Sequence, residues 1–381
     1  MNLDLSDEQV FLREAARGTL SRLSTFEAAR SAMDGDDTAL PDLWPTSKEA
    51  GWPGLLIDEA HGGAGLDAFD AMLVLGECGR VLAAIPLLGH LPATAILSDA
   101  PAGEELLAPL AAGDQRAAYL PARPPDDVHE NWSADPARGL ARVDLPTAGE
   151  AGADGRVAVS GSFAFVPDAP GADLLVGVAL QDGKPVGVAI PADSPGVEVQ
   201  GVFRYDATRS LGHVSLHEAP AILLDASPES LAAAWHLAQA LIAAESIGAV
   251  ETALEVSVAY AKERYTFGRA IGSYQAVKHS LTEILRRLEN GRSLLYYAGW
   301  SRTGAPAEFP LAANAARSVA SQALDHAART MISVHGGIGA TWEHDAPLYF
   351  RRAQLSRRLL GGTGAATDRV AAELLDQADA A

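Results

Sequence analysis

The spacing of apolar residues changes twice along the 381-residue chain, and this zoning constrains the fold more than any single motif. Apolar positions recur at helical spacing in residues 1–117 and again in 226–381, whereas residues 118–225 contain short apolar runs separated by Gly, Pro and Asp. The clearest helical segments lie at 228–264, 274–300 and 309–334 and after Gly364, and the clearest strand-like runs at 156–166, 173–180 and 185–191. The sequence therefore predicts an α+β protein with an N-terminal helical domain, a middle β domain and a C-terminal helical domain.

Local signals agree with this zoning. Ser6, followed by two acidic residues, predicts the start of a helix, and residues 67–85 show helical spacing. Residues 51–67 predict a Gly-rich loop. Residues 121–155, which are rich in Pro, Asp and Gly, predict a loop over the surface.

Composition excludes several classes of protein. The formal net charge of -20 argues against a nucleic-acid partner, because binding to phosphates needs an electropositive face. The single cysteine, Cys78, excludes an intrachain disulfide and argues against a structural zinc or other metal site. The N-terminus has no signal-peptide pattern, and the Ala-rich run 231–244 contains His236 and Gln239, which favours a buried helix over a membrane span. The sequence predicts a cytoplasmic protein.

Three stretches resemble the acyl-CoA dehydrogenase family. They are the loop and following helix at 51–80, the run AYAKERYTFGRAIGSYQAVKHSLTEI (259–284) and the run VHGGIGATWEHDAPLYFRRA (334–353). The resemblance implies the fold of that family, with an N-terminal helical domain, a middle β domain and a C-terminal four-helix bundle. The last run is similar to a subgroup plentiful in actinobacteria, some of whose members act on steroid side chains as mixed two-chain tetramers.

The resemblance implies an FAD site shared between subunits. In that family the Arg and Thr of an R-x-T-F-G motif contact the pyrophosphate of FAD, and the matching residues are Arg264 and Thr266. A planar guanidinium and a hydroxyl are suitable donors to phosphate oxygens. Phe267 is expected to pack against the cofactor and Gln275 to lie near its adenosine half.

A Gly-rich turn after the third long helix adds four expected cofactor contacts. These are His335, Gly336, Gly337 and Gly339. Glycines of this kind allow a backbone to approach a dinucleotide closely. The alternative is an ordinary helix end and turn, just as Arg264 alone would be a solvated helix charge. The combined spacing of the two motifs favours the cofactor interpretation.

The middle domain departs from the family pattern. Residues 117–132 lack the Thr-Glu-Pro-Gly-Ala-Gly-Ser-Asp-like run that lies beside the flavin in the family. A second family run, ending in Trp-Ile-Thr-Asn-Gly, is replaced by FVPDA at 165–169. Phe165 can still stack on the flavin ring, but Pro167 removes a backbone donor and the expected Thr hydroxyl. We therefore expect this subunit to bind flavin, but more weakly than the family pattern would.

The catalytic base of the family is absent from both of its usual positions. Dehydrogenation needs a carboxylate to remove the proton alpha to the thioester. The C-terminal position falls in LLGGT (359–363), and the alternative position on the first long helix is Ala238. Glu245 lies two helical turns beyond Ala238 in an apolar stretch, which makes it the candidate base. The alternative is that Glu245 pairs with a cation from a neighbouring helix.

Two functional hypotheses follow. The first is an FAD-dependent enzyme that introduces an α,β-double bond into an acyl-CoA thioester, with Glu245 as base. The second is a catalytically silent subunit that completes the FAD site of a related partner in a tetramer. Either implies an acyl-CoA substrate and an electron-transferring flavoprotein or similar acceptor. Arginines 351, 352, 357 and 358 predict a basic cluster that meets the CoA phosphates or closes a subunit interface.

Overall fold

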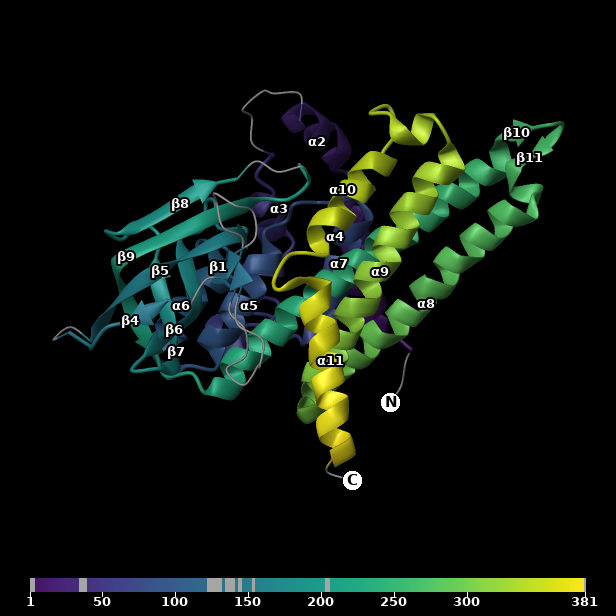
Figure 1. Cartoon of the computed structure of the whole chain (residues 1–381). Coiled ribbons are helices and arrows are strands. Elements are labelled where there is room, and N and C mark those ends of the chain that lie inside the picture. Colours follow the sequence, from purple (N-terminus) through teal and green to yellow (C-terminus); the bar gives the residue numbers. More distant parts are fainter. Residues whose placement is uncertain are drawn as a thin grey trace.

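Helices form both ends of the chain and strands form its middle, so the α+β prediction is confirmed (Figure 1). The computed structural model describes residues 4–33, 40–121, 132–133, 141–142, 146–152, 155–202 and 206–379. In Figure 1 the sheet lies on one side of the molecule and the long C-terminal helices on the other.

The N-terminal part is helical. Its helices are α1 (Asp7–Leu20), α2 (Thr25–Met33), α3 (Trp44–Glu49), α4 (Ala68–Arg80), α5 (Leu87–Ser98) and α6 (Glu104–Ala111), with 3-10 turns η1 (Trp52–Gly54), η2 (Glu59–His61) and η3 (Pro101–Gly103). Helix α1 begins as predicted: the Ser6 hydroxyl accepts the Gln9 amide at 3.2 Å, and the Gln9 side chain accepts the Ser6 amide at 3.1 Å. The predicted loop at 51–67 contains only the short turns η1 and η2.

Among the described residues, seven strands form one sheet in the order β1-β6-β4-β5-β9-β7, with β8 paired to β9. Because β7 also pairs with β6, the pairings return to their start and the sheet closes into a small barrel. The strands are β1 (Ala117–Leu120), β4 (Thr147–Ala148), β5 (Arg156–Pro167), β6 (Leu174–Gln181), β7 (Lys184–Pro191), β8 (Val197–Gly201) and β9 (Leu211–Leu224), and a separate pair is β2 (Trp132–Ser133) with β3 (Ala141–Arg142).

Sequence analysis found β5, β6 and β7 but missed β1, β8 and β9. Strand β9 was missed because His213, His217 and Glu218 interrupt its apolar residues with polar ones. The predicted loop at 121–155 contains the short strands β2, β3 and β4, and much of it lies outside the described residues.

The C-terminal part consists of long helices. They are α7 (Pro228–Glu263), α8 (Gln275–Gly304), α9 (Phe309–His335), α10 (Ala346–Ser356) and α11 (Gly362–Asp379), with hairpin strands β10 (Tyr265–Thr266) and β11 (Arg269–Ala270) and 3-10 turns η4 (Ile271–Ser273), η5 (Pro306–Glu308) and η6 (Ile338–Ala340). The three long predicted helices are confirmed, and α11 begins slightly earlier than predicted.

Helix α7 organises this half of the molecule. The Ser227 hydroxyl caps it by accepting the Ser230 amide at 3.1 Å, and Pro228 occupies its first turn. Helices α4, α5, α8, α9 and α10 all contact α7, and every residue from 234 to 250 is buried. An apolar core therefore runs continuously through both helical parts, while a second core fills the barrel.

No helix within the described ranges is both long enough and apolar enough to cross a membrane.

Candidate active site

Glu245 lies where α7 crosses α4 with almost no side chain between them. A Cβ added to Gly79 would lie 1.9 Å from the Glu245 carbonyl oxygen, and one added to Gly248 would lie 1.8 Å from the Gly76 carbonyl oxygen. Only glycine permits such an approach of two backbones. The crossing holds Glu245 at the centre of the molecule, where it is 5% exposed.

Both carboxylate oxygens of Glu245 are bonded to arginines. Oε2 accepts from Arg209, which precedes β9, and Oε1 accepts from Nη1 of Arg352 on α10 at 2.6 Å. All three side chains are buried. This arrangement matches the ion pair that the sequence left open as the alternative to a catalytic base: Arg352 comes from a neighbouring helix, as that alternative expected, whereas Arg209 comes from the loop before β9.

Arg352 connects three parts of the structure. Its Nε donates to Asp206 Oδ2 at 3.0 Å and to Thr208 Oγ1 at 3.1 Å, and its Nη2 approaches the Leu82 carbonyl oxygen at 3.4 Å. Burial acts to lower the pKa of Arg352, but the carboxylates of Glu245 and Asp206 raise it above its ordinary value. The Arg352 guanidinium therefore contacts residues of all three parts of the fold: the N-terminal helical part, the barrel part and the C-terminal helices.

The predicted cluster of C-terminal arginines is wrong as a single site. Arg352 is buried, whereas Arg351 lies over the Trp342 ring at 4.4 Å and Arg357 approaches Asp325 at 4.0 Å. Neighbouring residues on a helix point in different directions, so the four charges separate. Sequence analysis also missed Asp206 and Arg209, because an acidic and a basic residue before a strand are too common a pattern to indicate burial.

Neither usual base position presents a carboxylate in this structure. Ala238 is fully buried on α7, and Leu359 and Leu360 are 4% and 8% exposed. Arg317 on α9 donates to the Leu359 carbonyl at 3.2 Å, and Gln239 donates to the Leu360 carbonyl at 3.0 Å. Burial, with the repulsion of Arg209, lowers the pKa of Arg317 to about 9.

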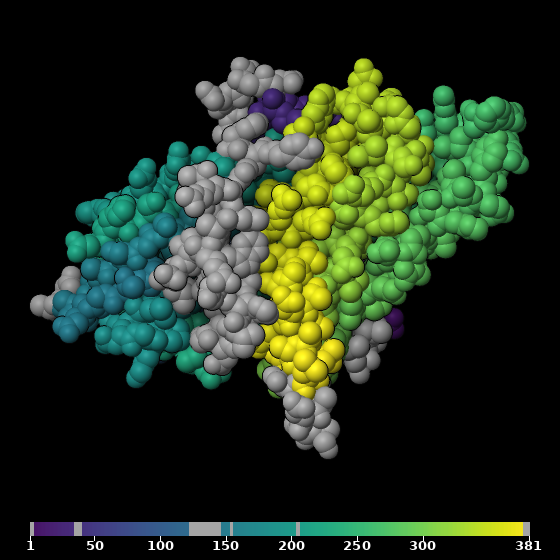
Figure 2. Space-filling view, in the orientation of Figure 1, coloured from purple at the N-terminus to yellow at the C-terminus, as the bar shows by residue number. Residues whose placement is uncertain are grey.

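The three residues of the R-x-T-F-G motif lie together at the C-terminal end of α7. Arg264 caps the helix, and Thr266 belongs to the β10–β11 hairpin. Phe267 is 93% exposed and has a positive φ of 49°, and the neighbouring Tyr265 is 65% exposed. Figure 2 shows this hairpin region (green) on the side of the molecule away from the barrel (teal). Exposed donors beside an apolar ring are suited to a phosphate-containing ligand with an aromatic part.

The other expected contacts lie at helix ends. Gln275 is the exposed first residue of α8. Gly336 has a φ of 64°, and a Cβ on Gly339 would lie 2.7 Å from the Ile332 carbonyl oxygen, so this turn requires glycine. His335, however, is only 4% exposed, and its Nδ1 bonds to the Met331 carbonyl oxygen at 2.7 Å.

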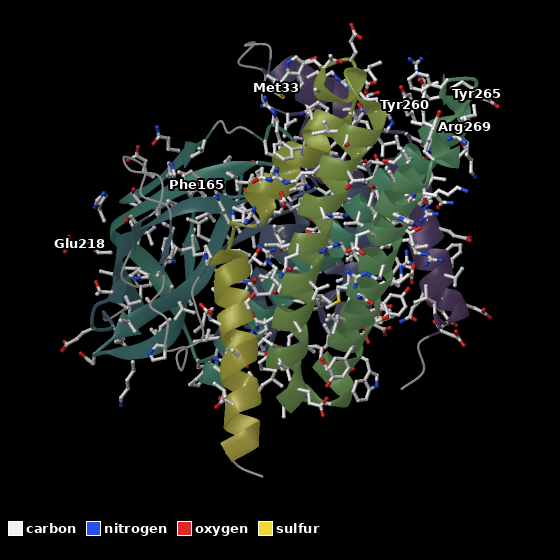
Figure 3. All side chains as sticks on the ribbon, turned by 45° about the vertical axis from the view of Figure 1, so that its right-hand side comes forward. Met33, Phe165, Glu218, Tyr260, Tyr265 and Arg269 are labelled. Atoms are coloured by element: carbon white, nitrogen blue, oxygen red, sulfur yellow. The ribbon has the colours of Figure 1, made fainter. Side chains whose placement is uncertain are left out.

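Phe165 lies on a β-bulge of β5. The register with β9 shifts between Phe163 and Val166, and Phe165 has a φ of 57°. Its amide donates to Nδ1 of His213 at 3.3 Å, and the two rings lie 4.7 Å apart. Figure 3 shows Phe165 on the barrel, far from Tyr265 and Arg269 at the hairpin.

The two sets of expected cofactor residues are too far apart to hold one cofactor within a single chain. Arg209, near the Phe165 bulge, contacts Glu245, and Arg264 lies 19 residues beyond Glu245, or about 28 Å along α7. The hairpin set offers exposed donors and an apolar ring, whereas the barrel set offers only the ring of Phe165. This separation fits a cofactor shared between subunits.

Comparison with known proteins identifies the class. The family model for the acyl-CoA dehydrogenase N-terminal domain matches residues 6–122, and the model for the C-terminal domain matches residues 232–375. The chain belongs to the acyl-CoA dehydrogenase family, whose members are oxidoreductases with FAD as cofactor.

The most similar relatives include proteins from mycobacteria. The chain is 32% identical to acyl-CoA dehydrogenase IpdE2 of Mycobacterium tuberculosis over 93% of either chain. It is 31% identical to acyl-CoA dehydrogenase FadE34 of the same organism, covering 97% of this chain but only 48% of that protein.

Solved structures agree with the fold. A variant of the Tcur3481–Tcur3483 steroid ACAD is 26% identical with a TM-score of 0.85, covering 98% of this chain and 99% of that one. The ChsE4–ChsE5 complex of Mycobacterium tuberculosis gives a TM-score of 0.84 at 24% identity, with the same coverage.

Proposed function

We propose that this chain is a subunit of an FAD-dependent acyl-CoA dehydrogenase and completes the cofactor site of a related subunit that supplies the base. The observation that carries this proposal is the engagement of both Glu245 oxygens by Arg209 and Arg352. A general base needs an oxygen within reach of the substrate proton, and here each oxygen already accepts a charge-assisted bond.

The hairpin end of α7 supports the proposal that this chain completes the cofactor site of a related subunit. Arg264 and Thr266 donate to the pyrophosphate, the Gly336–Gly339 turn brings backbone close to it, and Phe267 becomes covered on assembly. Bound FAD accepts the hydride that leaves the beta carbon of the thioester. The contribution of this chain is to hold the cofactor, and its own buried charges stay in the ion-pair network.

For the substrate we propose a bulky acyl-CoA of the steroid side-chain class. This rests on the likeness to a protein described as a steroid ACAD, together with the resemblance of residues 334–353 to steroid-degrading members. The electron acceptor is an electron-transferring flavoprotein or a similar carrier. That the chain works in the cytoplasm stays a prediction from the sequence.

The second candidate is a self-sufficient dehydrogenase subunit with Glu245 as base. The observation that favours it is the Phe165 bulge, because a positive φ at a non-glycine residue costs energy and such strain concentrates at functional sites. In this case one arginine must release a Glu245 oxygen when substrate binds.

Expression alone and with related acyl-CoA dehydrogenase chains encoded nearby separates the two candidates. The proposal predicts little flavin absorbance and no turnover for the chain alone, and one FAD per two chains with turnover in the mixed assembly. A chain that alone binds one FAD per subunit and oxidises acyl-CoA would overturn the proposal in favour of the second candidate.

A further inference from the structure

Three aromatic rings, here called the ring stack, pack in contact beside the Gly-rich turn that follows α9, with their planes tilted by 31° and 44°. The His335 ring centroid lies 4.3 Å from that of Tyr260 on α7 and 4.1 Å from that of His344, which precedes α10. Two rings this close to one imidazole cannot share a face, so His335 lies between them. The stack joins the end of α7 to the segment between α9 and α10, near the hairpin end of the molecule, where Figure 3 labels Tyr260.

Hydrogen bonds to the backbone fix both imidazoles. The Met331 carbonyl can only accept, so His335 Nδ1 carries a proton and donates to it at 2.7 Å. The Ala346 amide can only donate, so His344 Nδ1 accepts from it at 3.0 Å. Burial, together with the neighbouring His335, lowers the pKa of His344, which favours its neutral form.

The ring stack contacts the ends of both segments that we propose to hold the FAD pyrophosphate, namely Arg264 and the Gly336–Gly339 turn. The Tyr260 carbonyl oxygen accepts the Arg264 amide at 2.8 Å, one helical turn away, so Arg264 is anchored directly to the residue at one end of the stack. At the C-terminal end of α9, Gly336 follows His335 immediately. The separation of the α7 and α9 ends therefore depends on the contact between Tyr260 and His335, and the His344 ring supports this contact by packing on His335.

We infer that His344 is a positioning residue of the cofactor site: it packs on His335 and holds this ring against Tyr260, and the Tyr260–His335 contact sets the distance between Arg264 and the Gly336–Gly339 turn. The rings act through the backbone they support and do not touch the cofactor. Sequence analysis treated His335 as a direct contact with the cofactor, and its burial supports the positioning role instead. The inference rests on the proposed function, in which these two segments hold FAD.

Two substitutions of His344 separate stacking from hydrogen bonding. His344→Phe keeps a ring in the stack and removes the acceptor for the Ala346 amide. His344→Asn keeps an acceptor close to the position of Nδ1 and removes the ring. FAD affinity is measured by fluorescence titration of the deflavinated mixed assembly, and thermal stability is measured without FAD.

The inference predicts that His344→Asn weakens FAD binding about 3- to 10-fold, the scale of one aromatic contact, while His344→Phe stays within about twofold of wild type. The opposite order would assign His344 to capping α10, and equal affinity in both variants would remove its role. Either result overturns the inference.

A matched control removes a comparable ring contact elsewhere. The Phe69 and Tyr296 rings lie 4.9 Å apart, so Phe69→Ala should lower thermal stability without changing FAD affinity. Weaker FAD binding in this control would show that affinity follows overall stability and would contradict a specific positioning role. A wild-type mixed assembly that binds no FAD would instead overturn the proposed function.

Discussion

The middle of α7 and its C-terminal end are built in opposite ways. From residue 234 to 250 every side chain is buried, and Glu245, the charged residue there, has partners for both oxygens. At the other end Arg264, Tyr265 and Phe267 are exposed. A buried charge without a partner is unstable, whereas exposed apolar rings mark a surface that another molecule covers. The comparison supports the proposal that the middle of the helix has a structural role and that its end contacts a ligand.

The largest effect is expected for Arg352→Met in the middle region. The substitution removes one partner of Glu245 and of Asp206, and should lower the free energy of unfolding by about 3–5 kcal/mol, as for other broken buried pairs. Chemical denaturation measures this. The control is Arg351→Met, which loses a ring contact with Trp342 and a weak contact with Met33 Sδ at 3.9 Å and should cost less than about 1 kcal/mol. Equal losses would show that the middle network contributes no special stability.

The stability of the protein as a function of pH tests the charge network through Asp168, a buried carboxyl whose pKa responds to Arg209 and Glu245. Burial, opposed by the Gly89 amide, raises the pKa of Asp168 from 3.8 to about 6. The folded state then holds this proton more tightly than the unfolded chain, so the contribution of Asp168 to stability falls as pH rises through that window, by at most about 3 kcal/mol. Asp168→Asn keeps an acceptor for Gly89. Its stability relative to wild type should therefore increase between pH 4 and pH 7, and a constant difference would contradict the raised pKa.

Arg264→Ala addresses the exposed end. Losing a charge-assisted contact to the pyrophosphate should weaken FAD binding about 10- to 100-fold, or roughly 1.5–3 kcal/mol, with little change in thermal stability. FAD retention by the assembled protein is the measurement. Arg286→Ala, an exposed arginine on α8 paired with Glu283, serves as the control and should bind FAD normally. Unchanged affinity in the Arg264 variant would remove the cofactor assignment.

Phe267→Ala should have the smallest of these effects, and it should change only the affinity of the subunits for one another. Covering a phenylalanine on association contributes about 1.5–3 kcal/mol at most, so subunit association should weaken by about tenfold without loss of monomer stability. Phe11, which is 74% exposed on α1, offers a matched control. Sedimentation of the two variants should separate them, and identical association would mean that Phe267 stays uncovered.

Local patterns predicted much of the fold and located the exposed residues that we propose to contact the cofactor. Helical spacing located α7, α8 and α9, and a contiguous motif located Arg264, Thr266 and Phe267, because these features depend on neighbours in sequence. Strand β9 was missed because an alternation of polar and apolar residues becomes informative only when its partners in the barrel are known.

The network around Glu245 could not be predicted in the same way. Arg352 and Asp206 are separated by 146 residues, and Arg209 approaches Glu245 only because the barrel packs against α7. The sequence indicated that Glu245 was a costly charge in an apolar helix. Which cations neutralise Glu245 depends on tertiary packing. The four C-terminal arginines were predicted to form one cluster, but only Arg352 of the four is buried.

The most direct test is Glu245→Gln, measured for both stability and turnover in the active mixed assembly. If Glu245 anchors the network, the variant strands buried guanidinium groups, and its free energy of unfolding should fall by about 3–5 kcal/mol. Turnover per folded, flavin-loaded molecule should then change little. A variant with normal stability and flavin content whose chemical step is about 100-fold slower would contradict this account and make Glu245 the base.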